Sequence, residues 1–303
     1  MSLDPSYLSY ARRGYGMDHD LYPWSNLFER SPLDLGGLRV GVAIVVNVEW
    51  FPITPGDKPF RAPGHMQTAY PDYRHYTSRE YGTRVGLYRF LDAFAARGVR
   101  ASFAVNAAIA ERYPELVADI VAGGHEIVAH STDMNGTIAT GLPEEEERAL
   151  IAASLDTLEK VVGTRPRGWM SIARSQSWNT PRLLAEAGLG YMCDWVNDDL
   201  PCRFATPAGP IVNVPINHEL SDRQIITVQQ QSADSYVQQM QDATMLFEGE
   251  GARFGARLLA LNLTPYIMGL PYRITAFEGL LDWLVAREGV GFVTTGEVAK
   301  SLA

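Results

Sequence analysis

The polar and ionisable side chains of this sequence gather where apolar, strand-like runs end. The run Leu38–Trp50 is nearly unbroken in apolar, β-branched residues and presents Asn47 and Glu49 near its end. Strand periodicity places these two side chains on the same face. A carboxylate at the C-terminal end of a buried parallel strand lies where barrel enzymes carry out chemistry. Glu49 is therefore a candidate general base, and a salt bridge at the rim is the alternative.

Other strand-like runs also end in polar residues. In a barrel the carboxyl ends of all strands meet at one mouth, so these side chains are expected to converge with Glu49. They are Asn106, His130, Asp194, Asn217 or His218, and Thr264. This convergence favours a functional Glu49 over a rim salt bridge.

Strand-like and helix-like segments alternate along the chain, and no shift in composition marks a linker. This order predicts one closed α/β barrel. A doubly wound open sheet is the alternative, but no glycine-rich phosphate loop follows the first strand. We expect residues 1–37 to form an irregular aromatic arm and residues 38–303 a single barrel domain.

The segment Phe51–Tyr81 is rich in proline, glycine and aromatic residues. Loops longer than ~12–15 residues are usually functional, so a lid or binding segment is expected here. The following segment, Thr83–Arg97, carries apolar residues at helical spacing and is expected to be a helix.

Composition excludes several classes of partner. The 303 residues are 46% hydrophobic and 20% charged, with a net charge of −9 and no Lys/Arg-rich block. Nucleic acid and anionic membranes are therefore not expected as partners. No apolar stretch is long enough for a membrane span, and the first residues do not resemble a secretion signal. Cys193 and Cys202 are too few for a disulfide framework or a structural zinc site. We expect a cytoplasmic protein.

Three motifs resemble those of a known family. Gly124-His125-Glu126-Ile127 with His130-Ser131 looks like the second motif of the NodB-homology polysaccharide deacetylases. Arg165-Pro166-Arg167-Gly168-Trp169 and Asp194-Trp195 resemble two later motifs, and the likeness runs from about Leu38 to the C-terminus. The aromatic arm, the first strand and residues 194–201 look most like the cytoplasmic branch that includes PuuE-type, metal-independent allantoinases. The resemblance implies a deformed (β/α)7 barrel and hydrolysis of a non-peptide C–N bond.

The sequence departs from this family at the residues that hold its metal and at those that act as its base and acid. The family's first-strand Asp-Asp pair is replaced by Asn47 and Glu49, its second motif histidine by Met134, and its late histidine by Thr264. A catalytic zinc normally needs three protein ligands, and a thioether is a poor ligand for it. We therefore expect no tightly bound metal. If zinc or another divalent ion binds, Glu49 and His130 are the expected ligands, with His218 or Asp133 as a replacement.

The chemistry that remains is amide or ureide hydrolysis, which needs an activated water, oxyanion stabilisation and a proton for the leaving nitrogen. Glu49 is assigned as the base, and His130 as the group that orients the water, stabilises the oxyanion or protonates the leaving group. The remaining candidates are assigned to substrate binding, with a structural role open for several of them. They are the amide donors Asn47 and Asn106, the pocket wall Trp169, the carboxylate support Arg165, and Asp194, His218 and Thr264.

Three functions follow from these assignments. The first is a hydrolase for a small amide or ureide that uses Glu49 and His130. The second is a divalent-metal-dependent deacetylase of an N-acetylated substrate, and the third is a catalytically silent family member that binds a small ligand. The aromatic arm would also suit the interface of a homo-oligomer.

Overall fold

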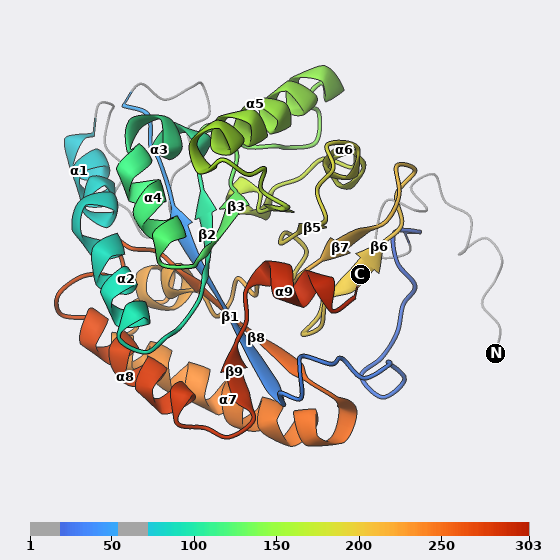
Figure 1. Cartoon of the computed structure of the whole chain (residues 1–303), viewed down its shortest axis with the longest axis vertical. Coiled ribbons are helices and arrows are strands. Elements are labelled where there is room, and N and C mark those ends of the chain that lie inside the picture. Colours follow the sequence, from blue (N-terminus) through green and yellow to red (C-terminus); the bar gives the residue numbers. More distant parts are fainter. Residues whose placement is uncertain (1–18, 54–71, 303) are drawn as a thin grey trace.

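The computed structural model describes residues 19–53 and 72–302, in which a nine-stranded sheet is surrounded by helices (Figure 1). The strands are β1 Val40–Val48, β2 Ser102–Val105, β3 Glu126–Ala129, β4 Gly168–Trp169, β5 Tyr191–Met192, β6 Cys202–Phe204, β7 Ile211–Asn213, β8 Arg257–Leu263 and β9 Val290–Phe292. The helices are α1 Tyr73–Tyr81, α2 Leu87–Ala95, α3 Ala107–Arg112, α4 Pro114–Ala122, α5 Glu144–Val162, α6 Thr180–Glu186, α7 Ala233–Phe254, α8 Ile274–Val285 and α9 Thr295–Lys300. Three shorter turns are the π-helical η2 Gly82–Gly86 and η4 Arg223–Val228, and the 3₁₀ turn η3 Ile172–Arg174.

The sheet is a deformed, open barrel rather than the closed one expected from the alternation. Its strand order is β6-β7-β5-β4-β3-β2-β1-β8, with β9 beside the start of β1. All pairings are parallel except β6 with β7. Within the described residues no pairing joins β8 to β6, so the barrel stays open there. β6, at one edge of the sheet, is a short antiparallel strand that the sequence had not indicated.

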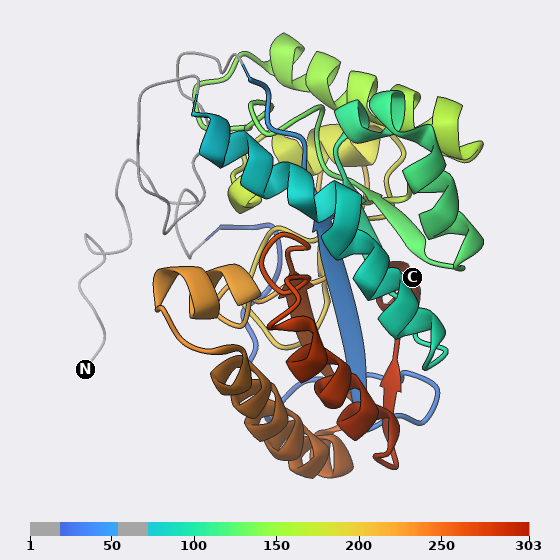
Figure 2. The same ribbon diagram turned by 90° about the vertical axis from the view of Figure 1, so that its left-hand side faces the viewer.

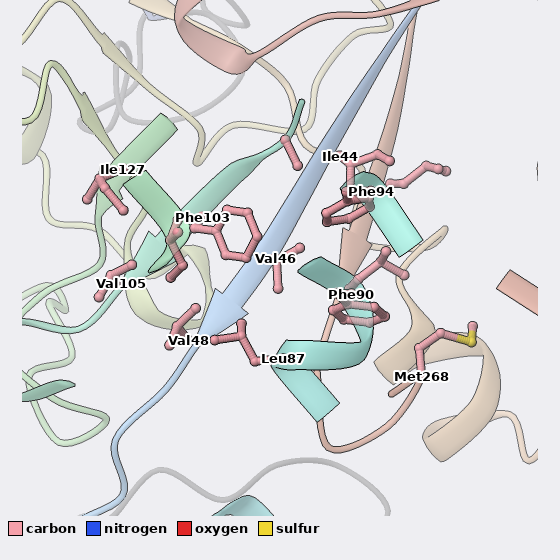
Figure 3. Close-up of a cluster of buried hydrophobic side chains, with 14 of the residues drawn as sticks. Ile44, Val46, Val48, Leu87, Phe90, Phe94, Phe103, Val105, Ile127 and Met268 are labelled. Atoms are coloured by element: carbon pink, nitrogen blue, oxygen red, sulfur yellow. The ribbon is translucent and has the colours of Figure 1, made fainter. Parts of the chain in front are cut away.

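β1 runs through the middle of the molecule (Figures 1 and 2), and the side chains on its two faces belong to different clusters. Ile44, Val46 and Val48 pack with the α2 aromatic residues Phe90 and Phe94 (Figure 3). The alternate residues Ala43 and Val45 belong to a separate apolar cluster on the other face. Because side chains alternate along a strand, Asn47 and then Glu49 continue this second face at its carboxyl end. The predicted orientation of the two polar residues is confirmed by this packing.

The segment after β1 is partly helical. Tyr73–Tyr81 forms α1, which continues through the π-helical turn η2 into α2, so the helix expected at Thr83–Arg97 begins ten residues earlier. The expectation of one long loop reaching Tyr81 is therefore wrong. Asp72 explains the earlier start, because its side chain accepts a hydrogen bond from His75 N and caps α1. The middle of the predicted lid, residues 54–71, lies outside the described residues.

The described part of the aromatic arm packs against the β6–β7 edge. Tyr22 lies on Phe204 with ring centroids 4.8 Å apart, and His19 lies edge-on to Trp195 at 5.2 Å. Arg30 forms an ion pair with Asp198. In residues 19–53 and 72–302 no helix has the length and apolar character needed to cross a bilayer.

Candidate active site

The carboxyl ends of the strands surround a cavity of about 490 Å³. Six of the residues selected from the sequence line it, namely Asn47, Glu49, His130, Asp194, His218 and Thr264. The other lining residues are Met170, Ser171, Ala173, Arg174, Val196, Ser221, Arg223 and Asn262. The convergence that parallel strand ends predicted is therefore present for these six.

Glu49 is buried and held by two partners from distant parts of the chain. The Nη2 atom of Arg223 lies 2.8 Å from both carboxylate oxygens, and the Tyr266 hydroxyl donates to Oε2 at 2.8 Å. Burial alone would raise the pKa of Glu49, but the positive charge of Arg223 and the hydrogen bonds from Arg223 and Tyr266 outweigh it. The pKa of Glu49 therefore lies below its ordinary value, and the carboxylate is ionised at neutral pH.

His130 is buried beside Glu49 and presents one ring nitrogen as an acceptor. Its Nδ1 lies 2.6 Å from the carbonyl oxygen of Met170. A carbonyl only accepts, so Nδ1 carries the proton and Nε2 is left with its lone pair. Burial lowers the pKa of His130 below its ordinary value, despite the opposing charge of Glu49. The imidazole is therefore neutral at neutral pH.

The side-chain amides of Asn47 on β1 and Asn262 on β8 line one side of the cavity. Asn47 Nδ2 donates to Asn262 Oδ1 at 2.6 Å and to the carbonyl oxygen of Leu263 at 3.1 Å. The side chain of Asn47 therefore holds the side chain of Asn262 in place. Because Asn262 Oδ1 is used by Asn47, the amide nitrogen of Asn262 is the group that can donate to a ligand.

Asp194 holds the turn that follows β4. Its Oδ1 accepts from Ser171 N at 2.6 Å, and its Oδ2 accepts from Ser171 Oγ at 2.8 Å and from Gln176. Burial raises the pKa of Asp194 to about 6, against the lowering effect of these donors. Neither His130 nor Arg165 is among its hydrogen-bond partners in the described residues.

Thr264 and His218 occupy the remaining sides. The backbone nitrogen of Thr264 donates to Asp222 Oδ2 at 2.7 Å, and its hydroxyl lies 3.5 Å from Arg223 Nη2. His218 Nδ1 lies 3.4 Å from Arg174 Nη1. Burial and the charge of Arg174 lower the pKa of His218, so it is neutral at neutral pH.

Three residues selected from the sequence do not line this cavity. Asn106 accepts from Trp50 N at 2.7 Å and donates to the carbonyl oxygen of His130, so it ties the ends of β1 and β3 together. Trp169 is fully buried in the main apolar core. Arg165 pairs with Asp156 and Glu159 on the surface of α5, both at 2.7 Å. The structure corrects their expected positions, because each side chain is engaged elsewhere.

The cavity does not fit the divalent metal that the family resemblance implies. Over the described ranges no group of three or more His, Cys, Asp or Glu side chains is placed to hold an ion. The guanidinium of Arg223 already supplies the positive charge against both oxygens of Glu49. Met134, at the position of a family ligand, is buried and is not among the cavity-lining residues, and neither is Asp133.

Arg223, Tyr266 and Arg174 are important residues that the strand-end argument missed. Arg223 lies 174 positions from Glu49 at the start of η4, and Tyr266 follows β8 by three residues. No strand ends at Arg223, so the criterion of a polar residue at a strand end could not identify it. Arg174 lies in the turn after β4, and extending the search a few residues past each strand end would have found it.

The sequence is similar to those of known proteins. Residues 80–192 match the family model described as polysaccharide deacetylase. A Schizosaccharomyces pombe protein assigned by name to the polysaccharide deacetylases is 25% identical over 241 residues, which are 73% of this chain and 74% of that protein.

Two solved structures share the fold along nearly the whole chain. The crystal structure of PuuE allantoinase has a TM-score of 0.83 and 26% sequence identity, covering 92% of this chain and 97% of that one. A Pseudomonas aeruginosa PAO1 protein that is also assigned by name to the polysaccharide deacetylases has a TM-score of 0.82 and 26% identity, with the same 92% and 97% coverage. Residues 80–192 are thus similar to the polysaccharide deacetylase family, and the fold of the chain is similar to that of PuuE allantoinase.

Proposed function

We propose that this protein hydrolyses a non-peptide C–N bond of a small amide or ureide, with Glu49 as the base and His130 assisting. The observation that carries the proposal is the pairing of an ionised carboxylate with a neutral imidazole on one cavity. Glu49 has a lowered pKa through Arg223, and His130 presents Nε2 as an acceptor because Nδ1 faces the Met170 carbonyl. Both are acceptors for the two hydrogens of one water molecule.

The reaction starts with that water. One O–H bond breaks as its proton passes to Glu49, while the other hydrogen is held by His130 Nε2 and the water oxygen attacks the substrate carbonyl carbon. The C–N bond then breaks, and the proton on Glu49 passes to the leaving nitrogen. Atoms and charge balance, because the amide and one water give an acid and an amine.

Arg223, beside Glu49, can stabilise the negative charge that develops on the substrate during this reaction. In the resting site Arg223 pairs with the Glu49 carboxylate. When Glu49 takes the water proton it becomes neutral, and the negative charge moves to the carbonyl oxygen. Arg223 and the amide of Asn262 are the donors that can stabilise this oxyanion without a net charge change in the buried cavity.

The test is a panel of amides, ureides and N-acetylated sugars, assayed with wild type and Glu49→Gln. The substitution keeps the shape of the side chain and removes the base, so we expect turnover to fall by about 10²–10⁴-fold with an unchanged circular dichroism spectrum. Glu145→Gln is the control, because Glu145 is an exposed residue of the first turn of α5. Glu49→Gln with wild-type turnover would contradict the proposal.

The same panel separates the other two functions. The polysaccharide deacetylase family model favours an N-acetylated sugar as the second candidate substrate. Turnover that is confined to N-acetylated sugars and lost with a chelator would favour the metal-dependent deacetylase. Ligands that raise the melting temperature without any hydrolysis would favour the silent binder.

A further inference from the structure

We propose that Arg174 is a substrate-recognition residue that binds a carboxylate, so that the substrates are carboxylate-bearing amides or ureides of the N-acyl and N-carbamoyl amino acid type. This inference rests on the proposed hydrolysis, because it places the C–N bond at Glu49 and His130 and the carboxylate at Arg174 in the same cavity. All three side chains belong to its lining.

Arg174 has unused hydrogen-bonding capacity. Its Nε donates to the carbonyl oxygen of Ile216 at 3.1 Å, and its Nη1 has a long contact of 3.4 Å with His218. Its Nη2 is buried and has no hydrogen-bond partner among the described residues. A planar guanidinium with two available terminal nitrogens matches the two oxygens of a carboxylate.

Arg174 also lacks an acidic partner. Among the residues that the structure describes, none forms an ion pair with it. The charge of Asp194 acts on Arg174, but both Asp194 oxygens are bound by Ser171 and one also by Gln176. A largely enclosed cation is costly unless it is paired, and a bound anion would supply the missing partner.

The backbone at Ala173 and Arg174 adopts an unusual conformation that orients the Arg174 side chain. Ala173 and Arg174 have φ values of 53° and 54°, two consecutive left-handed residues that are not glycine. Such strain persists only where surrounding structure holds it, and it is concentrated at functional sites. Here Ser171 is anchored by Asp194, and Arg174 N donates to Ser171 O at 3.0 Å. The same turn contributes the Met170 carbonyl that holds His130, so it fixes both the reacting group and the anchor.

Arg174 lies where two cavities adjoin. It lines the cavity of Glu49 together with Asp194 and Val196, and these three also line a neighbouring cavity of about 530 Å³. Gln176 and Trp178 line that second cavity. A ligand that extends from the reacting carbonyl into the second cavity therefore passes the Arg174 side chain.

The experiment compares matched substrates that differ only in the charged group. N-Carbamoylglycine and N-acetylglycine are each assayed against their own C-terminal primary amides, with wild type, Arg174→Gln, Arg174→Lys and the surface control Arg148→Gln. Arg148 is on α5 and pairs with Glu144 and Glu186. Binding of the same four compounds to Glu49→Gln, with and without Arg174→Gln, is measured by calorimetry.

We expect wild type to prefer the carboxylates by about 10- to 100-fold in kcat/KM, mainly through KM, as hydrogen bonds to a charged group predict. Arg174→Gln should reduce this preference to less than about threefold, Arg174→Lys should give an intermediate value, and Arg148→Gln should keep the wild-type ratio. Arg174→Gln should not lower the melting temperature, whereas a merely structural arginine would lower it.

Failure of this inference is distinguishable from failure of the proposed function. Hydrolysis of both members of a pair at similar rates, or a preference that survives Arg174→Gln, would overturn the inference and leave the function standing. Selective binding of the carboxylates through Arg174 without turnover would support the inference and overturn the proposed hydrolysis. Neither binding nor turnover of any of the four would overturn the inference, while the proposed function would be overturned only by absence of turnover across the whole panel.

Discussion

Replacing Arg223 with methionine removes the positive charge that keeps Glu49 ionised in the interior. The two side chains are 13% and 3% exposed, so solvent can do little to replace the lost partner. Methionine fills similar space without a charge or a donor. The Glu49 carboxylate would retain the Tyr266 hydrogen bond and lose both contacts to Arg223.

The expected loss in the free energy of unfolding at pH 7 is about 3–5 kcal/mol, the range for breaking a buried ion pair from one side. The sign of its pH dependence follows from Glu49. Its pKa in the folded protein lies below the ordinary value of 4.5, so the pair stabilises the fold above that pH and the contribution is lost as the pH falls through the lowered pKa. The difference between variant and wild type should therefore shrink under acidic conditions.

Urea denaturation at pH 7 and pH 4 measures this difference. Arg97→Met is the matched control, because Arg97 pairs with an Asp282 side chain that is 64% exposed, and such surface pairs contribute less than about 1 kcal/mol. The double variant Glu49→Gln with Arg223→Met should recover part of the stability, since it leaves no buried charge. If Arg223→Met costs no more than Arg97→Met at pH 7, the description of Glu49 as an ionised carboxylate held by Arg223 is refuted.

Two further predictions concern Asp222 and Gly86. Burial raises the pKa of Asp222 from 3.8 to about 7, so wild-type stability should fall as the pH rises through this interval. In urea denaturation, the free energy of unfolding of Asp222→Asn should not fall with pH over this interval. A pH dependence equal to that of wild type would contradict the prediction. At Gly86 an added Cβ would lie 2.1 Å from the Pro265 carbonyl oxygen, so Gly86→Ala should cost about 1–3 kcal/mol. Gly279→Ala, in an open part of α8, should instead stabilise by about 0.5–1 kcal/mol, and equal melting temperatures would refute the clash.

Much of the scaffold could be predicted because its signals are local. The alternating faces of β1 follow from strand geometry, and they place Asn47 and Glu49 on the cavity side. β3 and β8 were also located by their apolar runs, which end at His130 and Thr264. The antiparallel β6 was missed because a short edge strand has little apolar periodicity.

The functional state of Glu49 could not be predicted, because it depends on contacts between distant segments. Glu49 is separated from Arg223 by 174 residues and from Tyr266 by 217. Arg165 illustrates the opposite error, since a motif placed it near the site while its charge is satisfied by Asp156 and Glu159 on α5. A motif gives the residue type and its strand, whereas packing decides which way a long side chain turns.

The hydrogen bond between His130 and position 170 has a consequence for the genetics of this protein. The bond uses the main-chain oxygen of Met170, which every amino acid supplies, whereas Asn106 ties the ends of β1 and β3 through side-chain atoms. In a library of single codon changes, buried apolar substitutes such as leucine should be tolerated at position 170, while position 106 should accept very few alternatives. Position 170 can thus vary among buried apolar residues in different lineages, and its role in fixing the imidazole proton would leave no trace in the identity of that residue.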